Sequence, residues 1–500
     1  MAKKLYKSFG YKAIQIVVLT LYSILLIPIL LNFWDLEVYG AWIAIYAFFN
    51  LIQVLELGHS MYVGNEFNFI VHNDSKAAKR VLGSALRGNI LIGGLQLVVV
   101  AFLYVTGLFD YILDAEVSSF EAATVLGVLF LYRMTMGSFR GLVVKALNPF
   151  GLIYKAFQFN LIEKILEFGV LCSAAFLDLS LLQLAIVWFV VKFAYSSIVL
   201  FQIRNLLPEF YPWWRYGSFK HGFQNVRKSF AFVGSNFLDR LGNDGIVLVV
   251  SALMGSTFLP LFSATRTIVN FGLKLSDFFL APLAPEMINL YAKKRKKQLM
   301  EIFKGYWLMT GGILMLGFTL SLFFIEPLFT LWTNDTLQFS MLLYCALIII
   351  FLVQNHGKVL YSFFMGINRT RLVLMTSLLR ILLFFGVVLS FQEYGLNAVL
   401  GALFVAELII AGAWLPIATY KEFEVSNRQK IFLYNNLISV LLLALLYGLF
   451  LMDSNLIFLI AIYLIIIILQ GIQFYQISAD SRRKLAKNFQ KLVTFARKGK

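Results

Sequence analysis

Long apolar stretches separated by short polar gaps follow one another along almost the whole chain. A membrane-spanning helix needs roughly 20 mostly apolar residues, and the gaps here are too short to hold a soluble domain. The pattern therefore predicts an all-α integral membrane protein with about 14 transmembrane helices. The predicted spans are residues 11–33, 38–63, 82–107, 121–144, 155–177, 181–204, 228–253, 259–291, 300–325, 339–366, 371–391, 396–419, 431–452 and 457–478.

Charge in the connections between these spans alternates from one connection to the next. The odd-numbered connections contain no Lys or Arg and several are acidic; we call them the acidic-side connections: 34–37, 108–120, 178–180, 254–258, 326–338, 392–395 and 453–456. The even-numbered connections and both termini are basic, with a run of five cations at 293–297, and we call them the basic-side connections. Because Lys and Arg collect on the cytoplasmic side of a membrane, both termini are expected in the cytoplasm.

Composition supports the membrane class and excludes several others. Hydrophobic residues make up 60% of the chain, and the mean hydropathy is +0.80. The formal net charge of +17 is dispersed between apolar spans instead of forming one basic surface, so no nucleic-acid partner is expected. Cys172 and Cys345 both lie inside apolar runs, which argues against a disulfide framework or a cysteine metal site.

The longest basic-side connection, 205–227, is rich in Pro, Trp and charge and divides the chain into repeated halves. Repeated halves are common in transporters. The predicted organisation is an N-terminal six-helix lobe (1–204), a cytoplasmic linker lying on the membrane surface (205–227), a C-terminal six-helix lobe (228–420), two extra transmembrane helices (421–478) and a basic cytoplasmic tail (479–500).

Ionisable side chains inside the spans are the candidate site residues, because a charge at bilayer depth is costly unless it is paired or faces water. Arg133 and Arg140 are seven residues apart and share one helix face. The full set of predicted substrate-binding residues is Arg133, Arg140, Arg266, Lys274, Lys358, Arg380, Asn50 and Asn270. The candidate coupling carboxylates are Glu163, Asp239, Asp244 and Asp277.

Each of these residues has a second interpretation as a structural ion pair between helices or a side chain that reaches the membrane interface. Glu163 and Glu167 lie on one face of the fifth predicted span, with Lys164 beside them, and are the expected partners of the cations. Spread of arginine over several spans favours an anionic substrate, since the guanidinium fork matches phosphate and carboxylate geometry.

Catalytic patterns are missing from the sequence. It contains no P-loop, no zinc-type His spacing and no Gly-x-Ser-x-Gly elbow. We therefore expect no enzyme activity, no cofactor and no metal site, and a primary pump in this chain alone is excluded.

Four short segments resemble the polysaccharide flippases of the multidrug/oligosaccharidyl-lipid/polysaccharide exporter superfamily. They are Asp35 to Trp42, Asn50 to Gly58, Pro282 to Glu286 and Tyr394 to Val399. The resemblance implies a V-shaped pair of six-helix lobes with a cationic central cavity, through which an undecaprenyl-diphosphate-linked oligosaccharide is flipped outward by alternating access. Two positions depart from the family pattern: Glu56-Leu57-Gly58 stands where Asp-Leu-Gly is usual, and the run 62–66 replaces an expected basic residue.

The leading hypothesis is export of an O-antigen or capsule repeat unit across a bacterial inner membrane for surface polysaccharide (lipopolysaccharide) biosynthesis. Its partners would be the lipid-linked oligosaccharide, membrane lipids, and glycosyl transferases or a polymerase of the same pathway. A cation-coupled multidrug exporter of the same superfamily, driven by H⁺ or Na⁺, is the second hypothesis. A membrane glycosyl transferase or polymerase is the third, and it should show a large outer loop that this sequence lacks.

Overall fold

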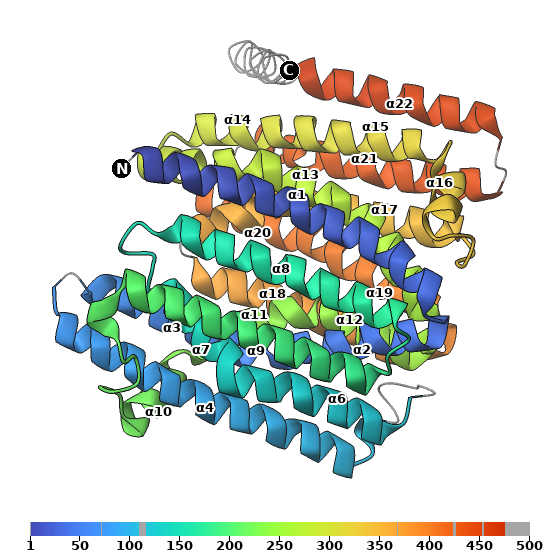
Figure 1. The fold of residues 1–500 in the computed structure, drawn as a ribbon. Coiled ribbons are helices and arrows are strands. Elements are labelled where there is room, and N and C mark those ends of the chain that lie inside the picture. The colour runs from blue at the N-terminus through green and yellow to red at the C-terminus, as the bar shows by residue number, and fades with distance from the viewer. Residues whose placement is uncertain are drawn as a thin grey trace. The chain divides into compact units, whose positions relative to one another are not determined.

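The computed structural model describes residues 2–71, 73–109, 117–367, 369–423, 427–452 and 455–475, and within them every regular element is a helix (Figure 1). Contacts divide the chain into two compact units, Met1–Leu261 and Phe262–Lys500. We call them the first and second units and describe each by itself. The predicted basic tail, most of the acidic connection 108–120 and Asp453 lie outside the described residues, as do the side chains of Asp239, Pro282 and Glu286.

In the first unit, the predicted spans fall on helices that are continuous or briefly interrupted. The helices are α1 (Ala2–Phe33), α2 (Leu36–Ile52), α3 (Val54–Ile70), α4 (Ser75–Val105), α6 (Ser119–Tyr132), η1 (Arg133–Gly137), α7 (Ser138–Lys145), α8 (Ile153–Phe176), α9 (Leu181–Leu206), η2 (Pro208–Phe210), α10 (Phe219–Lys228), α11 (Phe230–Leu241), α12 (Asp244–Met254) and η3 (Ser256–Phe258). The span 38–63 divides at Gln53 into α2 and α3, and the span 228–253 divides into α11 and α12.

The second unit is helical in the same way. It contains α13 (Leu259–Ala292), which starts just before the boundary, then α14 (Lys296–Tyr306), η4 (Trp307–Gly311), α15 (Gly312–Ser321), α16 (Ile325–Trp332), α17 (Met341–Gly366), α18 (Thr370–Ser390), η5 (Gln392–Tyr394), α19 (Leu396–Ile409), η6 (Ile410–Trp414), α20 (Leu415–Phe423), α21 (Asn427–Met452) and α22 (Leu456–Tyr475). Within the described residues each of the fourteen predicted spans falls on helix apart from short breaks, and the all-α membrane fold is confirmed.

Seven helices in the described part of the chain are long and apolar enough to cross a membrane, and an eighth is added if the bent pair Lys296–Ser321 and Ile325–Trp332 is one span. Other predicted spans fall short for identifiable reasons. Helix α8 carries Glu163, Lys164 and Glu167 within four turns of its end, and the span over α11 and α12 is broken near Gly242. Intramembrane charges and helix breaks are themselves features of transporter interiors.

Capping residues set several helix starts on the acidic side. The Asp35 carboxylate accepts a hydrogen bond from the Val38 backbone N–H at 2.8 Å, and Ser180 forms a capping box with Gln183 at the start of α9. These interactions satisfy backbone N–H groups that the first helical turn leaves unpaired. They fix where the chain re-enters the apolar region after two very short connections.

Helices α11 and α12 pack within the first unit, α11 against α3 and α12 against α2. The approach is close: a Cβ at Gly58 would lie 2.6 Å from the backbone nitrogen of Val233. The boundary between compact units consequently falls after α12, beyond the predicted linker at 205–227. The two units are defined by their internal contacts and not by a repeat of six spans, so they do not test the lobes at 1–204 and 228–420, which stay a prediction.

Candidate functional site

Five buried or half-buried charged residues of α7, α8 and α9 form one cluster in the first unit. Arg140 pairs with Glu163, and Lys192 lies 3.0 Å from Glu163 and 2.7 Å from Glu167. Lys164 adds a second cation to Glu167 at 2.7 Å. We call this set (Arg140, Glu163, Lys164, Glu167 and Lys192) the charge cluster. Three cations face two carboxylates, which leaves one positive charge in excess.

Helix periodicity and helix packing bring the charge cluster together. Glu163 and Glu167 are four residues apart and therefore lie on one face of α8. Lys192 lies on α9, which packs along α8, so one ammonium group reaches both carboxylates. The pairing of Glu163 and Glu167 with cations, expected from the sequence, is present.

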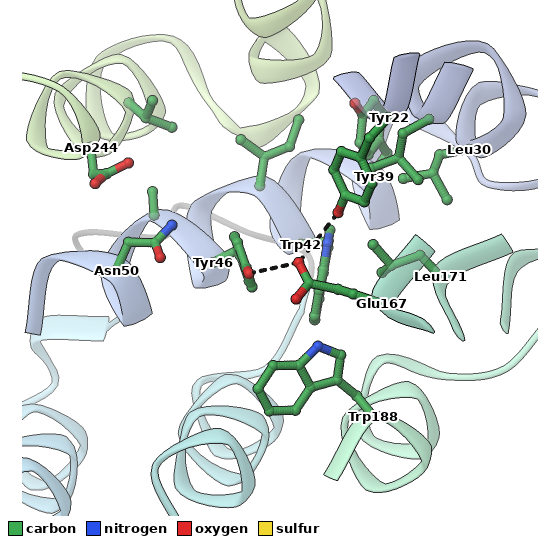
Figure 2. Close-up of a pocket in the computed structure, with 14 residues that line it drawn as sticks. Tyr22, Leu30, Tyr39, Trp42, Tyr46, Asn50, Glu167, Leu171, Trp188 and Asp244 are labelled. Carbon is green, nitrogen blue, oxygen red and sulfur yellow. Dashed lines mark hydrogen bonds between the residues drawn. The ribbon is translucent and has the colours of Figure 1, made fainter. Parts of the chain in front are cut away.

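A cavity of about 250 Å³ lies beside the charge cluster. Its walls are mostly aromatic and aliphatic, and they come from α1, α2, α8, α9 and α12: Tyr22, Leu26, Leu30, Tyr39, Trp42, Ile43, Tyr46, Ala47, Asn50, Glu167, Leu171, Trp188, Asp244 and Val247. Figure 2 shows Glu167 between Tyr46 and Trp188, with Asn50 and Asp244 at the other end of the cavity. The cavity thus combines apolar walls with a few convergent polar groups, as ligand sites do.

Two phenol groups orient the carboxylate that faces the cavity. Tyr46 Oη donates to Glu167 Oε1 at 3.1 Å, and Tyr22 Oη donates to the same oxygen at 3.4 Å (Figure 2). Lys192 holds the other oxygen, Oε2. With four partners, Glu167 is fixed in place and its charge is well compensated.

Arg133, at the junction of α6 and η1, pairs with a different carboxylate, that of Glu56 on α3. Its Nε donates to Glu56 Oε2 at 2.9 Å, and its Nη2 donates to Oε1, so the pair is bidentate. Glu56 is only 2% exposed. The amide oxygen of Gln53, in the orientation that suits its neighbours, also accepts from Arg133 Nε at 3.1 Å.

Charged side chains of the second unit also pair. Lys358 lies 2.7 Å from Asp277, and Arg380 Nε lies 2.8 Å from Glu407. Arg266, Asn270 and Lys274 follow one another at four-residue steps on α13, and all three are partly buried.

The structure therefore groups the predicted residues into several separate sets. In the first unit Arg140 and Glu163 belong to the charge cluster, Asn50 and Asp244 line the cavity, and Arg133 lies in its own pair. Asp239, a candidate coupling carboxylate, is not among the residues whose side chains the structure describes. Glu56, Glu167, Tyr22 and Tyr46 were not among the predicted site residues; the intramembrane carboxylates were visible in the sequence, whereas nothing distinguished these tyrosines from other aromatic residues.

Comparison with known proteins gives matches in structure but not in sequence. No family model matches the chain, and no curated protein sequence matches it. An inward-facing multidrug resistance MATE family transporter of the MOP superfamily superposes with a TM-score of 0.65 at 15% identity, over 81% of this chain and 96% of that structure. The lipid II flippase MurJ in an inward closed conformation gives 0.63 at 15% identity, over 95% of this chain and 99% of that structure.

This chain has the MOP-superfamily fold. A further structure with that fold, a Pyrococcus furiosus transporter whose binding pocket is described as having reversed polarity, matches at a TM-score of 0.53 and 14% identity over 85% of this chain and 97% of its own length. At identities this low the likeness concerns the MOP fold itself. The fold class expected from the sequence agrees with it.

Proposed function

We propose that this protein is a transporter that moves an undecaprenyl-diphosphate-linked oligosaccharide repeat unit from the inner to the outer leaflet by alternating access. The observation that carries the proposal is the excess positive charge of the charge cluster, three cations against two carboxylates among apolar helices. A net cation inside a membrane protein is costly and favours an anionic partner. A diphosphate group meets that requirement.

The length of the chain supports a lipid-linked substrate. The lipid II flippase covers 95% of this chain, whereas the multidrug transporter with the higher TM-score covers 81%. Helices α21 and α22 follow the twelve spans of the predicted lobes, and in the second unit they pack against α17 and α15. The hydroxyls of Thr319 on α15 and Tyr447 on α21 lie 3.0 Å apart, so α21 is part of a packed unit.

A cation-coupled multidrug exporter is the second candidate, and the cavity favours it. Its walls are aromatic, and it contains the carboxylates of Glu167 and Asp244. Aromatic walls and a carboxylate suit an organic cation. Against it, both Glu163 and Glu167 already contact two cations each, so a further cation would gain little attraction there.

We place the protein in a bacterial inner membrane with both termini in the cytoplasm, as the alternation of basic connections predicts. Its expected partners are membrane lipids and the glycosyl transferases or polymerase that make and consume the lipid-linked repeat unit. No cofactor is proposed beyond a coupling ion, H⁺ or Na⁺.

The test is complementation in a bacterial host that lacks its own repeat-unit flippase. Expression of this chain should restore surface polysaccharide. The single variants Arg133→Gln, Arg266→Gln and Lys274→Gln should lose export while the protein remains in the membrane, because each removes a cation that the sequence predicts to bind substrate. Restored export in all three variants would reject the site assignment. Failure of the well-inserted wild type, together with resistance to cationic dyes, would favour the multidrug exporter.

A further inference from the structure

Irregular backbone flanks the Arg133–Glu56 pair on both of its helices. Arg133 is the first residue of η1, a π-helical turn in which the Ser138 N–H donates to the Arg133 carbonyl. Glu56 lies three residues after Gln53, where α2 ends and α3 begins. Single π turns and helix breaks often mark functional sites and allow a helix to bend.

Helix α4 supports both irregular places with buried amides. Gln96 Nε2 donates to the carbonyl of Ile52 at 3.2 Å, at the end of α2, and Asn89 Nδ2 donates to the carbonyl of Ser138 at 3.2 Å, just after η1. Gln96 is fully buried and Asn89 nearly so. Asn89 and Gln96 are seven residues apart and so lie on one face of α4. The interruptions are thus stabilised features of the fold.

Close packing holds η1 directly against α4. A Cβ at Gly93, between the two amides, would lie 2.7 Å from Met134 Cβ. Only a glycine permits this approach without displacement of the π turn. Arg133 is therefore held on a positioned turn of backbone, while its side chain bonds Glu56.

The pair adjoins the cavity along both helices. Asn50, which lines the cavity, precedes Gln53 by three residues on α2. Tyr132, next to Arg133, packs edge-on against the cavity residue Trp188 with ring centroids 5.0 Å apart. A ligand in the cavity would lie within one or two helical turns of Arg133.

We propose that Glu56 is an internal substitute for the phosphate of the substrate. Its carboxylate occupies the guanidinium fork of Arg133, and a diphosphate displaces it as α2–α3 and η1 bend apart. A carboxylate and a phosphate make the same bidentate contact with arginine, so one replaces the other without leaving the cation unpaired. This inference rests on the proposed function, since it assumes that the transported group is a prenyl diphosphate.

The exchange reduces the apparent affinity for substrate, because ligand binding must compete with Glu56. Removal of the Glu56 charge should therefore tighten binding. The purified full chain would be titrated with farnesyl diphosphate as a short prenyl diphosphate and with farnesol as the uncharged control. We expect Glu56→Gln to lower the Kd for farnesyl diphosphate about tenfold and to leave the Kd for farnesol unchanged.

The gain should require Arg133. The double variant Glu56→Gln/Arg133→Gln should bind farnesyl diphosphate no more tightly than Arg133→Gln alone. Glu301→Gln is the matched control, because it also removes a carboxylate from an ion pair, with Lys304 at 3.1 Å on α14 of the second unit. It should leave the Kd unchanged. If Glu56→Gln is unstable, Glu56→Asp, which keeps the charge but shortens its reach, should show a smaller gain.

Each outcome separates the two proposals. If Glu56→Gln has an unchanged or higher Kd for farnesyl diphosphate, while wild-type binding and export are intact, the role of Glu56 is overturned and the proposed function stands. If neither the wild type nor Glu56→Gln binds farnesyl diphosphate, both the role of Glu56 and the proposed function are overturned. A tenfold gain that persists without Arg133 shows that Glu56 acts on another cation and also overturns the inference.

Discussion

At the scale of single residues, Lys192 holds the charge cluster together. Its ammonium group contacts Glu163 and Glu167 and lies 4.6 Å from the centroid of the Trp188 ring. Its side chain is only 7% exposed, so no solvent compensates the carboxylates if it is lost. Removal of one partner from a buried ion pair leaves an uncompensated charge, which costs more than the pair contributed.

Substitution of Lys192 by Met should therefore destabilise the protein strongly. We expect a loss of about 3 kcal/mol or more in the free energy of unfolding, seen as a lower Tm in a thermal shift assay of purified protein. Lys76→Gln, at the exposed start of α4, is the control and should change the Tm little. Equal Tm values for Lys192→Met and wild type would mean that the cluster is not the buried network described.

Sequence identified the charges inside the spans but not all of their partners. The four-residue step from Glu163 to Glu167 could be read directly, whereas the partner of Arg133 is 77 positions away along the chain. A straight helix through residues 38–63 places Glu56 off the face of Asn50 and Gln53. In the structure α2 ends and α3 begins at Gln53, and the support of this point by Gln96 is a tertiary contact that a single sequence does not reveal.

At the scale of elements, α10 shows how the predicted linker attaches to the first unit. Helix α10 packs along α4 through glycines: a Cβ at Gly222 would lie 2.6 Å from the carbonyl oxygen of Ser84, and one at Gly88 would lie 3.2 Å from the carbonyl oxygen of Gly222. The outward side of this segment exposes Phe219 and Phe223 beside basic residues. That combination suits a membrane surface with anionic lipids.

A side chain at Gly222 should separate α10 from α4. Because the nearest atoms are backbone, Gly222→Val cannot be accommodated by a rotamer change, and we expect trypsin to cleave after Lys220, Arg227 or Lys228 many times faster than in the wild type. Gly94→Val, on α4 where a Cβ meets nothing within 4 Å, is the matched control and should be cleaved at the wild-type rate. Equal cleavage in the two variants would argue against close docking of α10.

The spans were predictable because an apolar stretch of sufficient length has few alternatives in a membrane. Their interruptions were not. The π turns at Arg133–Gly137, Trp307–Gly311 and Ile410–Trp414 leave the hydrophobic pattern unbroken, and α16 lies in a stretch assigned to a connection. These features depend on neighbours such as Asn89, which become adjacent only after packing.

At the scale of the whole molecule, the number of spans decides on which side of the membrane each charged connection lies. Fourteen spans joined by short connections must alternate sides, and all Lys and Arg of the connections then fall on one side. Loss of any one span would reverse every connection after it and place basic and acidic residues together. The alternation therefore supports the count even where intramembrane charges make single spans weakly apolar, as in α8.

This topology can be measured with alkaline phosphatase, which is active only when it has been exported from the cytoplasm. Fusions after Asp178 and Glu326, in acidic-side connections, should have high activity, whereas fusions after Lys145 and Arg369, in basic-side connections, should have low activity. The pair Lys145 and Asp178 tests the two ends of α8 alone. If both fusions gave the same activity, α8 with its charges would not cross the membrane, and every later connection would exchange sides. High activity after Arg369 with low activity after Glu326 would therefore place the miscounted span in the first half of the chain. The predicted activities at all four positions require α8 to span the membrane despite Glu163, Lys164 and Glu167, with its charges compensated inside the protein.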